Sequence, residues 1–196
     1  MRNEQFGFRP RHSTSLQLTR LVERITSNFG ENRFTGAVFL DVAKAFDTVW
    51  IDGLLYKLTP QFSSYIVHTI SSYFRDRTFE ESFQTTTSSF RGMRADVAQG
   101  GKISSVLFNL YVNDLPPASQ HVELALYVDD TAIIATSLKP TLLVSYLDSY
   151  LNDLQRWLSD WGIAINVSKG TAKIFKRAGW RFIQPRPVTL FRETIE

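Results

Sequence analysis

The sequence predicts an α/β (α+β) fold, in which a small antiparallel sheet packs on helices. A buried strand is expected over residues 35–41, where an apolar run after a glycine ends in Asp41. A β-hairpin is expected over 124–135, where two β-prone apolar runs flank Asp129 and Asp130. Long stretches with apolar residues at helical spacing precede and follow these strands, which predicts helices beside the sheet.

The ends of the helices are marked by capping residues. Ser13 or Thr14 can cap a helix that ends at Gly30, and Asp47 is expected to cap a helix that runs to Leu58. Further helices are expected at 61–74, 102–115 and 140–161, strands at 79–83, 90–94 and 171–175, and a last hairpin at 188–196. The helix at 102–115 is apolar nearly all round, which predicts that it is buried.

Length and composition bound the class of protein. The 196 residues suffice for one sizeable domain or a large part of a bigger one, and 43% are hydrophobic. The absence of Cys excludes disulfides and Cys-ligated zinc, and the net charge of +3 is compatible with a polyanionic partner. We expect no secretory leader and no membrane span. The expected location is intracellular, with nucleus and cytoplasm both left open.

Two adjacent carboxylates at a hairpin tip are the chemical focus of the chain. Asp129 and Asp130 repel each other unless a cation, a proton or N–H donors compensate. A divalent metal is one such compensator, and a solvated turn is the alternative, because Asp is common in turns. Asp41 is either a third functional carboxylate or a helix cap. Three carboxylates on adjacent strands can hold two Mg²⁺ ions roughly 3.5 to 4 Å apart, an arrangement that serves phosphoryl transfer.

Two loops have compositions that suit a ligand. Residues 5–12 place aromatic side chains between cations, which suits a nucleic acid. They are equally a surface loop that Phe6 and Phe8 pin to the core. Gly100 and Gly101 precede a helix, where a flexible turn can approach a ligand closely, although a Gly pair is weak evidence of a site.

Five motifs in order resemble the reverse transcriptase domain of non-LTR retrotransposons, and the similarity is greatest to jockey-like elements of insects. The motifs are 5–9 with 12–14, 39–47, 99–100 with 107–111 and 113–116, 127–130, and 161–169. The resemblance implies a polymerase palm with incomplete fingers and no thumb. It divides the chain into 1–35 (fingers and palm entry), 36–60 (first catalytic strand and helix), 61–97 (fingers insertion and hairpin), 98–137 (buried helix and YxDD hairpin) and 138–196 (later palm helix and strands).

The implied activity is RNA-directed DNA synthesis, in which a primer 3′-hydroxyl attacks a dNTP with the help of two Mg²⁺ ions, or Mn²⁺ as a substitute. The implied partners are an RNA template, a DNA primer, dNTPs, and the finger and thumb segments that this chain is expected to lack. The resemblance also implies that the fragment alone is weak or inactive. The alternative function is that of a catalytically incomplete, nucleic-acid-binding remnant of such an element.

The resemblance assigns roles to individual residues. The metal site would comprise Asp41, Asp129 and Asp130, with Val42 beside it through its backbone N–H. The other assigned residues are Phe46, Gln99 and Gly100 at the nucleotide, Tyr127 at the primer end, Arg9 at the template or nucleotide, and Lys169 as proton donor to pyrophosphate. Core packing is the alternative for Phe46, and an ordinary surface position is the alternative for Lys169.

The sequence departs from the usual family pattern at several positions. None of these departures removes a catalytic carboxylate, but together they suggest a relaxed or decaying copy. They are Asp96, Lys102, Ser105, Val128 in the YxDD box, and Arg192, where a turn Gly is common.

Overall fold

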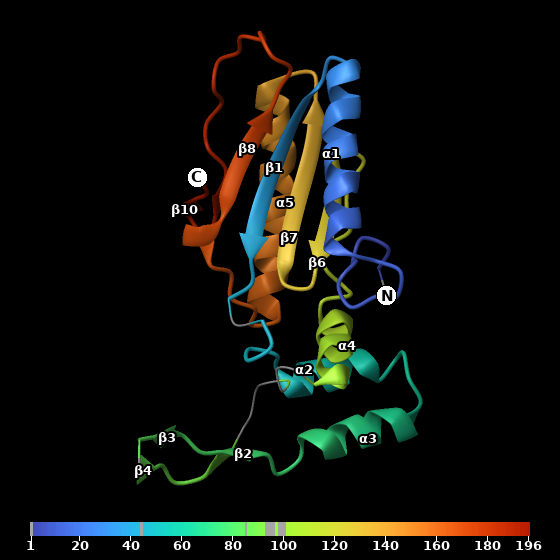
Figure 1. Ribbon diagram of the computed structural model, residues 1–196, viewed down its shortest axis with the longest axis vertical. Helices are drawn as coiled ribbons and strands as arrows, with labels where there is room; N and C mark the ends of the chain where they lie inside the picture. The colour runs from blue at the N-terminus through green and yellow to red at the C-terminus, as the bar shows by residue number, and fades with distance from the viewer. Residues whose placement is uncertain (1, 44, 85, 93–96, 98–100) are drawn as a thin grey trace.

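A four-stranded antiparallel sheet forms the centre of the molecule. The computed structural model describes residues 2–43, 45–84, 86–92, 97 and 101–196. The strand order is β6-β7-β1-β8, so β1 lies between a hairpin and the strand that closes the sheet (Figure 1). The strands are β1 (Phe34–Asp41), β6 (Val122–Tyr127), β7 (Asp130–Ser137) and β8 (Thr171–Phe175). The predicted strand, hairpin and antiparallel sheet are confirmed.

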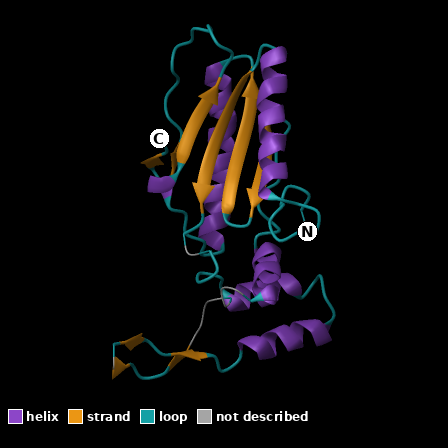
Figure 2. Ribbon diagram, in the orientation of Figure 1, coloured by secondary structure: helices purple, strands orange, loops and turns teal. Residues whose placement is uncertain are grey.

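One long helix packs on each face of this sheet. Helix α1 (Thr14–Gly30) runs along the face that carries Ala37, and helix α5 (Pro140–Asp160) lies behind the opposite face (Figure 2). Side chains alternate along a strand, so Val38 packs in the large core with α5. The Ser13 hydroxyl accepts the Leu16 N–H at 3.1 Å, which confirms the predicted cap of α1.

The elements between β1 and β6 in the chain lie beyond the carboxylate end of the sheet (Figure 1). Helix α2 (Ile51–Leu58) packs against α4 (Lys102–Tyr111), and α3 (Ser64–Phe74) follows α2. Short strands then form two ribbons, in which β2 (Thr78–Phe79) pairs with β5 (Arg91–Gly92) and β3 (Ser82–Phe83) with β4 (Thr86–Thr87). The predicted hairpin around the Thr/Ser turn is therefore present. Across the described residues, every helix is too short or too polar to cross a lipid bilayer.

The predicted helices are present, but three expectations about where they begin or end were wrong. Asp47 does not cap α2, because the turn after β1 continues to Thr48 and the helix begins at Ile51 with no side-chain cap. The helix expected at 61–74 begins at Ser64. Helix α4 ends at Tyr111, four residues before the predicted end at Leu115.

The predicted burial of α4 holds for one side only. Leu107 and Phe108 are fully buried, whereas Ile103 and Val106 are exposed. The reason is position, because α4 lies at the end of the sheet and packs on α2 and the core through one face.

The last hairpin contains a turn that favours glycine. Strands β9 (Thr189–Leu190) and β10 (Glu193–Thr194) are joined by Phe191 and Arg192, whose φ angles are 51° and 65°. A two-residue loop with both φ angles positive is a type I′ turn, in which Gly is preferred.

Replacing Arg192 with Gly is therefore expected to raise the free energy of unfolding by about 0.5 to 1 kcal/mol, because Gly adopts positive φ without strain. Urea denaturation measures the change. Arg192→Ala is the matched control, since it removes the charge and keeps the strained Cβ. Equal effects of the two variants would show that the backbone angle is not the cause.

Candidate active site

The sheet brings the three predicted carboxylates to one end. Asp41 is the last residue of β1, Asp130 is the first residue of β7, and the two are direct partners across the strands. Tyr127, the last residue of β6, is in turn the partner of Asp130. Asp129 lies in the loop between β6 and β7. Residues that are far apart in the chain therefore share the lower edge of the sheet in Figure 1.

The loop that carries Asp129 is strained. It comprises Val128 and Asp129, and Val128 has a φ angle of 60°. A β-branched residue avoids positive φ, and such a position costs about 1 to 3 kcal/mol unless its surroundings hold it. Of the two loop residues only the first has positive φ, which matches a type II′ turn, where Gly is usual. The departure at Val128 thus falls where a β-branched side chain is least suited.

The carboxylates interact electrostatically. Partial burial raises the pKa of Asp130 above its ordinary value, and the negative charges of Asp129 and Asp41 raise it further. The Lys169 ammonium lies 3.5 Å from Oδ2 of Asp41 and supplies the nearby positive charge. This pair is exposed, so it contributes little stability by itself. The site consequently carries mutual repulsion that a bound cation would relieve.

A cavity of about 420 Å³ opens beside Asp41 and Asp129. Its lining contains half of the residues that the sequence assigned to the site. These are Asp41, Val42, Phe46, Asp129 and Lys169, and they line the cavity together with Ala43, Ala45, Asp47 and Asn166. Tyr127 and Asp130 instead line a separate hollow of about 220 Å³ against α1. The carboxylates therefore lie between two hollows at the sheet edge.

The chain after α5 forms one wall of this cavity. The Ala43 N–H donates to the Ala164 carbonyl at 2.9 Å, and the Asn166 N–H donates to the Asp41 carbonyl at 3.1 Å. These bonds flank a bridge between Val42 and Ile165, so the Val42 N–H points away from Ile165. The same bonds bring the short 3₁₀ helix Val167–Lys169, and with it the Lys169 side chain, next to Asp41.

The Phe46 side chain packs against the core and also lines the cavity. Its ring lies against Phe108 with 5.1 Å between ring centroids, and it also contributes to the wall of the cavity. The structure is therefore compatible with core packing and with contact to a ligand in the cavity. Asp47, for which a helix cap was predicted, lines the same cavity with an exposed side chain.

The Arg9 side chain is hydrogen-bonded to the backbone of the N-terminal segment. Its guanidinium donates to the backbone carbonyls of Arg2 at 2.8 Å and Gln5 at 3.1 Å, which fixes the N-terminal segment. Its predicted contact with template or nucleotide stays a prediction. Gln99 and Gly100 lie outside the described residues, so their predicted place at the nucleotide is not addressed by the structure.

The donor set suits a hard divalent cation. The side chains at this edge offer carboxylate oxygens, which Mg²⁺ prefers, and the repulsion at Asp130 is what a cation would relieve. Within the described part of the chain, no three acidic or histidine side chains converge closely enough to enclose one ion. The edge is thus open, and Mg²⁺ at such sites commonly takes further ligands from substrate phosphates and water.

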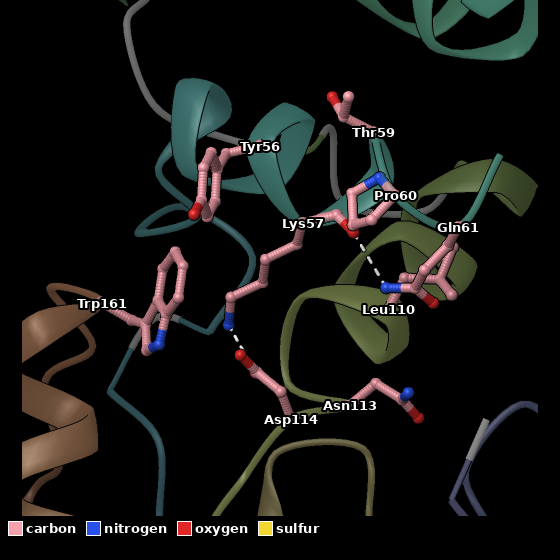
Figure 3. A pocket seen from close by; sticks show the side chains of 9 residues that line it. All are labelled: Tyr56, Lys57, Thr59, Pro60, Gln61, Leu110, Asn113, Asp114 and Trp161. Atoms are coloured by element: carbon pink, nitrogen blue, oxygen red, sulfur yellow. Dashed lines mark hydrogen bonds and ion pairs between the residues drawn. The ribbon is translucent and has the colours of Figure 1, made fainter. Parts of the chain in front are cut away.

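A second cavity, of about 490 Å³, shares no lining residue with the first (Figure 3). At its base the Lys57 side chain is 6% exposed, and its ammonium lies 2.6 Å from both the Tyr111 carbonyl and Oδ1 of Asp114. The ammonium also lies 3.6 Å from the ring centroid of Trp161. Burial lowers the pKa of Lys57 to about 8, against the opposing effect of Asp114. Sequence reasoning missed this group, because Lys57 occupies an ordinary helical position.

The family model for reverse transcriptase (RNA-dependent DNA polymerase) matches residues 1–186. The chain belongs to the reverse transcriptase family. Its curated relatives include the RNA-directed DNA polymerase from mobile element jockey of Drosophila melanogaster, at 33% identity over 172 residues. Another is the probable RNA-directed DNA polymerase from transposon BS of the same fly, at 35% identity over 174 residues. The predicted similarity to jockey-like elements is confirmed.

These matches cover 84% and 85% of this chain and 19% of each relative, so the chain spans about a fifth of the reverse transcriptase proteins that it resembles. Members of this family use divalent metal ions and bind an RNA template and a primer.

Solved structures of telomerase share the fold. Apo telomerase from Candida tropicalis, truncated from the C-terminal domain, superposes with a TM-score of 0.63 at 14% identity, over 90% of this chain and 37% of that one. Telomerase from the same organism in complex with a TWJ fragment of telomeric RNA gives a TM-score of 0.62 at 14% identity, over 90% and 31%. At this identity the likeness concerns the fold, and it confirms the predicted palm-type architecture of the reverse transcriptase chain.

Proposed function

We propose that this chain is the catalytic palm of an RNA-directed DNA polymerase, which transfers a nucleotide from a dNTP to a primer 3′-hydroxyl on an RNA template. One observation carries the proposal: the register of β1, β7 and β6 gathers Asp41, Asp129 and Asp130 at one sheet edge beside a cavity. The chain's membership of the reverse transcriptase family supports this assignment.

Each side chain then has a defined task. The oxygens of Asp41 and Asp129, which face the cavity, would hold Mg²⁺ together with Asp130. Two bound Mg²⁺ ions would supply activation of the primer hydroxyl and neutralisation of charge on the phosphate oxygens. The Lys169 ammonium, now paired with Asp41, would turn to the leaving pyrophosphate and donate a proton to it.

The remaining residues would hold the substrates. The Phe46 ring would lie beneath the sugar and exclude a 2′-hydroxyl by its bulk, and the Val42 N–H would donate to the triphosphate. Gln99 and Gly100 would adjoin the nucleotide, and Tyr127 would face the primer end. Template RNA, DNA primer and dNTP are the proposed partners, with finger and thumb segments of the whole polymerase.

A nucleic-acid-binding remnant is the second candidate function. It is favoured by the strained turn at Val128, where the sequence departs from the usual family pattern. A remnant would bind template-primer through phosphate contacts, and its affinity would fall with salt.

Primer extension on an RNA template, with Mg²⁺ and dNTP titrated separately, tests the proposal. A palm is expected to show extension that requires both components once finger and thumb segments are supplied, and weak or no extension as the isolated chain. Salt-dependent template-primer binding that gains nothing from Mg²⁺ and dNTP in the completed polymerase would favour the remnant instead.

A further inference from the structure

The backbone at Val128 has two hydrogen-bonding partners on one side chain. The Val128 N–H donates to Oε1 of Gln5 at 3.0 Å, and the Val128 carbonyl accepts from Nε2 of the same amide at 3.4 Å. Gln5 is 3% exposed, so water does not compete for these bonds. A buried amide whose two ends meet both polar groups of one backbone residue restrains that residue strongly.

The Gln5 side chain is itself fixed by its neighbours. Its Oε1 also accepts the Gly7 N–H at 2.8 Å. The backbone pairs with β6, because the Phe6 N–H donates to the Leu126 carbonyl at 2.9 Å and the Leu126 N–H donates to the Glu4 carbonyl at 3.0 Å. The segment therefore runs beside the strand that leads into the loop.

Close packing completes the restraint. A Cβ on Gly7 would lie 2.5 Å from both the nitrogen and Cγ2 of Val128, so the loop rests directly on a glycine. The Gly7 carbonyl in turn accepts from Nδ2 of Asn109, a buried residue of α4, at 2.9 Å. The loop is thus held from β6, from the N-terminal segment and from α4.

We infer that Gln5 is a positioning residue, whose amide holds Val128 at its strained backbone angle and thereby fixes the place of Asp129 at the cavity. Asp129 is the next residue in a two-residue loop, so a change at Val128 moves its carboxylate directly. The inference rests on the proposed function in one respect, that Asp129 is a metal ligand. It assigns to Gln5 a task other than contact with nucleic acid.

The test compares Gln5→Met with Gln17→Met in the whole chain. Gln17 is the matched control, because it is also buried and donates to the Glu4 and Leu126 carbonyls at 3.1 and 3.2 Å, but has no bond to Val128. Amide hydrogen exchange at Val128 and Asp129 reports on the loop without metal. Mn²⁺ binding, followed by electron paramagnetic resonance, reports on the place of the carboxylate.

In Gln5→Met, exchange at Val128 is expected to rise about tenfold or more, and Mn²⁺ affinity to fall about tenfold, the loss usual for a group that orients a ligand. Gln17→Met is expected to change both by about twofold or less, whatever its effect on thermal stability. Equal effects of the two variants, or no change at Val128 in Gln5→Met, would overturn the inference.

Val128→Gly provides a second arm. Gly adopts positive φ without strain, so the loop should depend less on Gln5, and Gln5→Met is expected to weaken Mn²⁺ binding about threefold or less in that background. An undiminished loss would show that Gln5 does not act through Val128. Should Gln5→Met not fold, Gln5→Glu retains the acceptor and is expected to keep the Val128 amide protected; loss of that protection would also overturn the inference.

The proposed function can fail separately. The metal role of the sheet edge is refuted if the wild-type chain binds no Mn²⁺, or if Asp129→Asn leaves its Mn²⁺ binding unchanged. The exchange experiment then still decides whether Gln5 holds the loop.

Discussion

Replacing Asp129 with Asn is expected to lower Mg²⁺-dependent primer extension by more than about 100-fold. Loss of a residue that merely orients a metal ligand typically costs 10- to 100-fold, so loss of a ligand oxygen should cost more. The amide is isosteric and leaves the loop intact, which separates chemistry from folding. Extension rates are compared in a polymerase that contains the remaining segments, because this chain spans 19% of its relatives.

The same substitution is expected to make the folded state more stable at neutral pH. The charge of Asp129 helps to raise the pKa of Asp130. When the pKa of a carboxyl is raised in the folded state, the free energy of unfolding falls as the pH rises through that pKa. Removing the charge relieves this loss. Asp153→Asn is the control, since Asp153 pairs with exposed Arg156 at the surface, and its substitution should change neither quantity much. Retention of more than about a tenth of the wild-type rate in Asp129→Asn would contradict the assignment.

The free energy of unfolding is expected to rise with pH between pH 8 and pH 10, by at most about 1.4 kcal/mol per pH unit, because of Lys57. In the folded chain its pKa is about 8, whereas the ordinary value is 10.5. In this window the unfolded state therefore binds the extra proton, and stability increases as protons are withdrawn. Burial raises the pKa of Tyr111, so its opposite contribution begins only above pH 10.

Urea denaturation across this window measures the slope, and Lys57→Met is the comparison. The variant is expected to lose the dependence and to be at least as stable as wild type at pH 7, because the lowered pKa of Lys57 means that burying its charge costs stability there. Asp114 is half-exposed, so water can hydrate its carboxylate when Lys57 is absent. Identical slopes for both chains would show that Lys57 titrates at its ordinary pKa.

Local patterns were sufficient for the sheet and for the carboxylate end of the site. Strand β1 was predicted from an apolar run that ends in Asp41, and the β6–β7 hairpin from two β-prone runs around an acidic pair. Both features depend on neighbours in sequence. Pairing of these strands then brings Asp41 and Asp129 together, because no long loop separates either residue from its strand.

Features that depend on distant contacts were missed. Asp47 resembles a helix cap in sequence, but α2 begins only at Ile51, with Trp50 at the cap position, which leaves Asp47 at the cavity. In sequence Lys57 resembles a solvent-facing cation, but the loop after α4 places Asp114 beside it and the C-cap of α5 places Trp161 over its ammonium. The sequence around Gln5 gives no sign of its hydrogen bonds to Val128, because the two residues are far apart in the chain and meet only in the folded structure.

The strand order has a consequence for synthesis of the protein on the ribosome. Strand β1 emerges early, but its two partners in the sheet are β7 and β8, which are translated much later. Until they are translated, β1 is an apolar strand with two unpaired edges, and such a strand is prone to aggregation or to chaperone binding. The carboxylate edge therefore forms late, when β7 pairs with β1. A nascent chain that stops at the end of β6 carries Asp41 without Asp129 and Asp130.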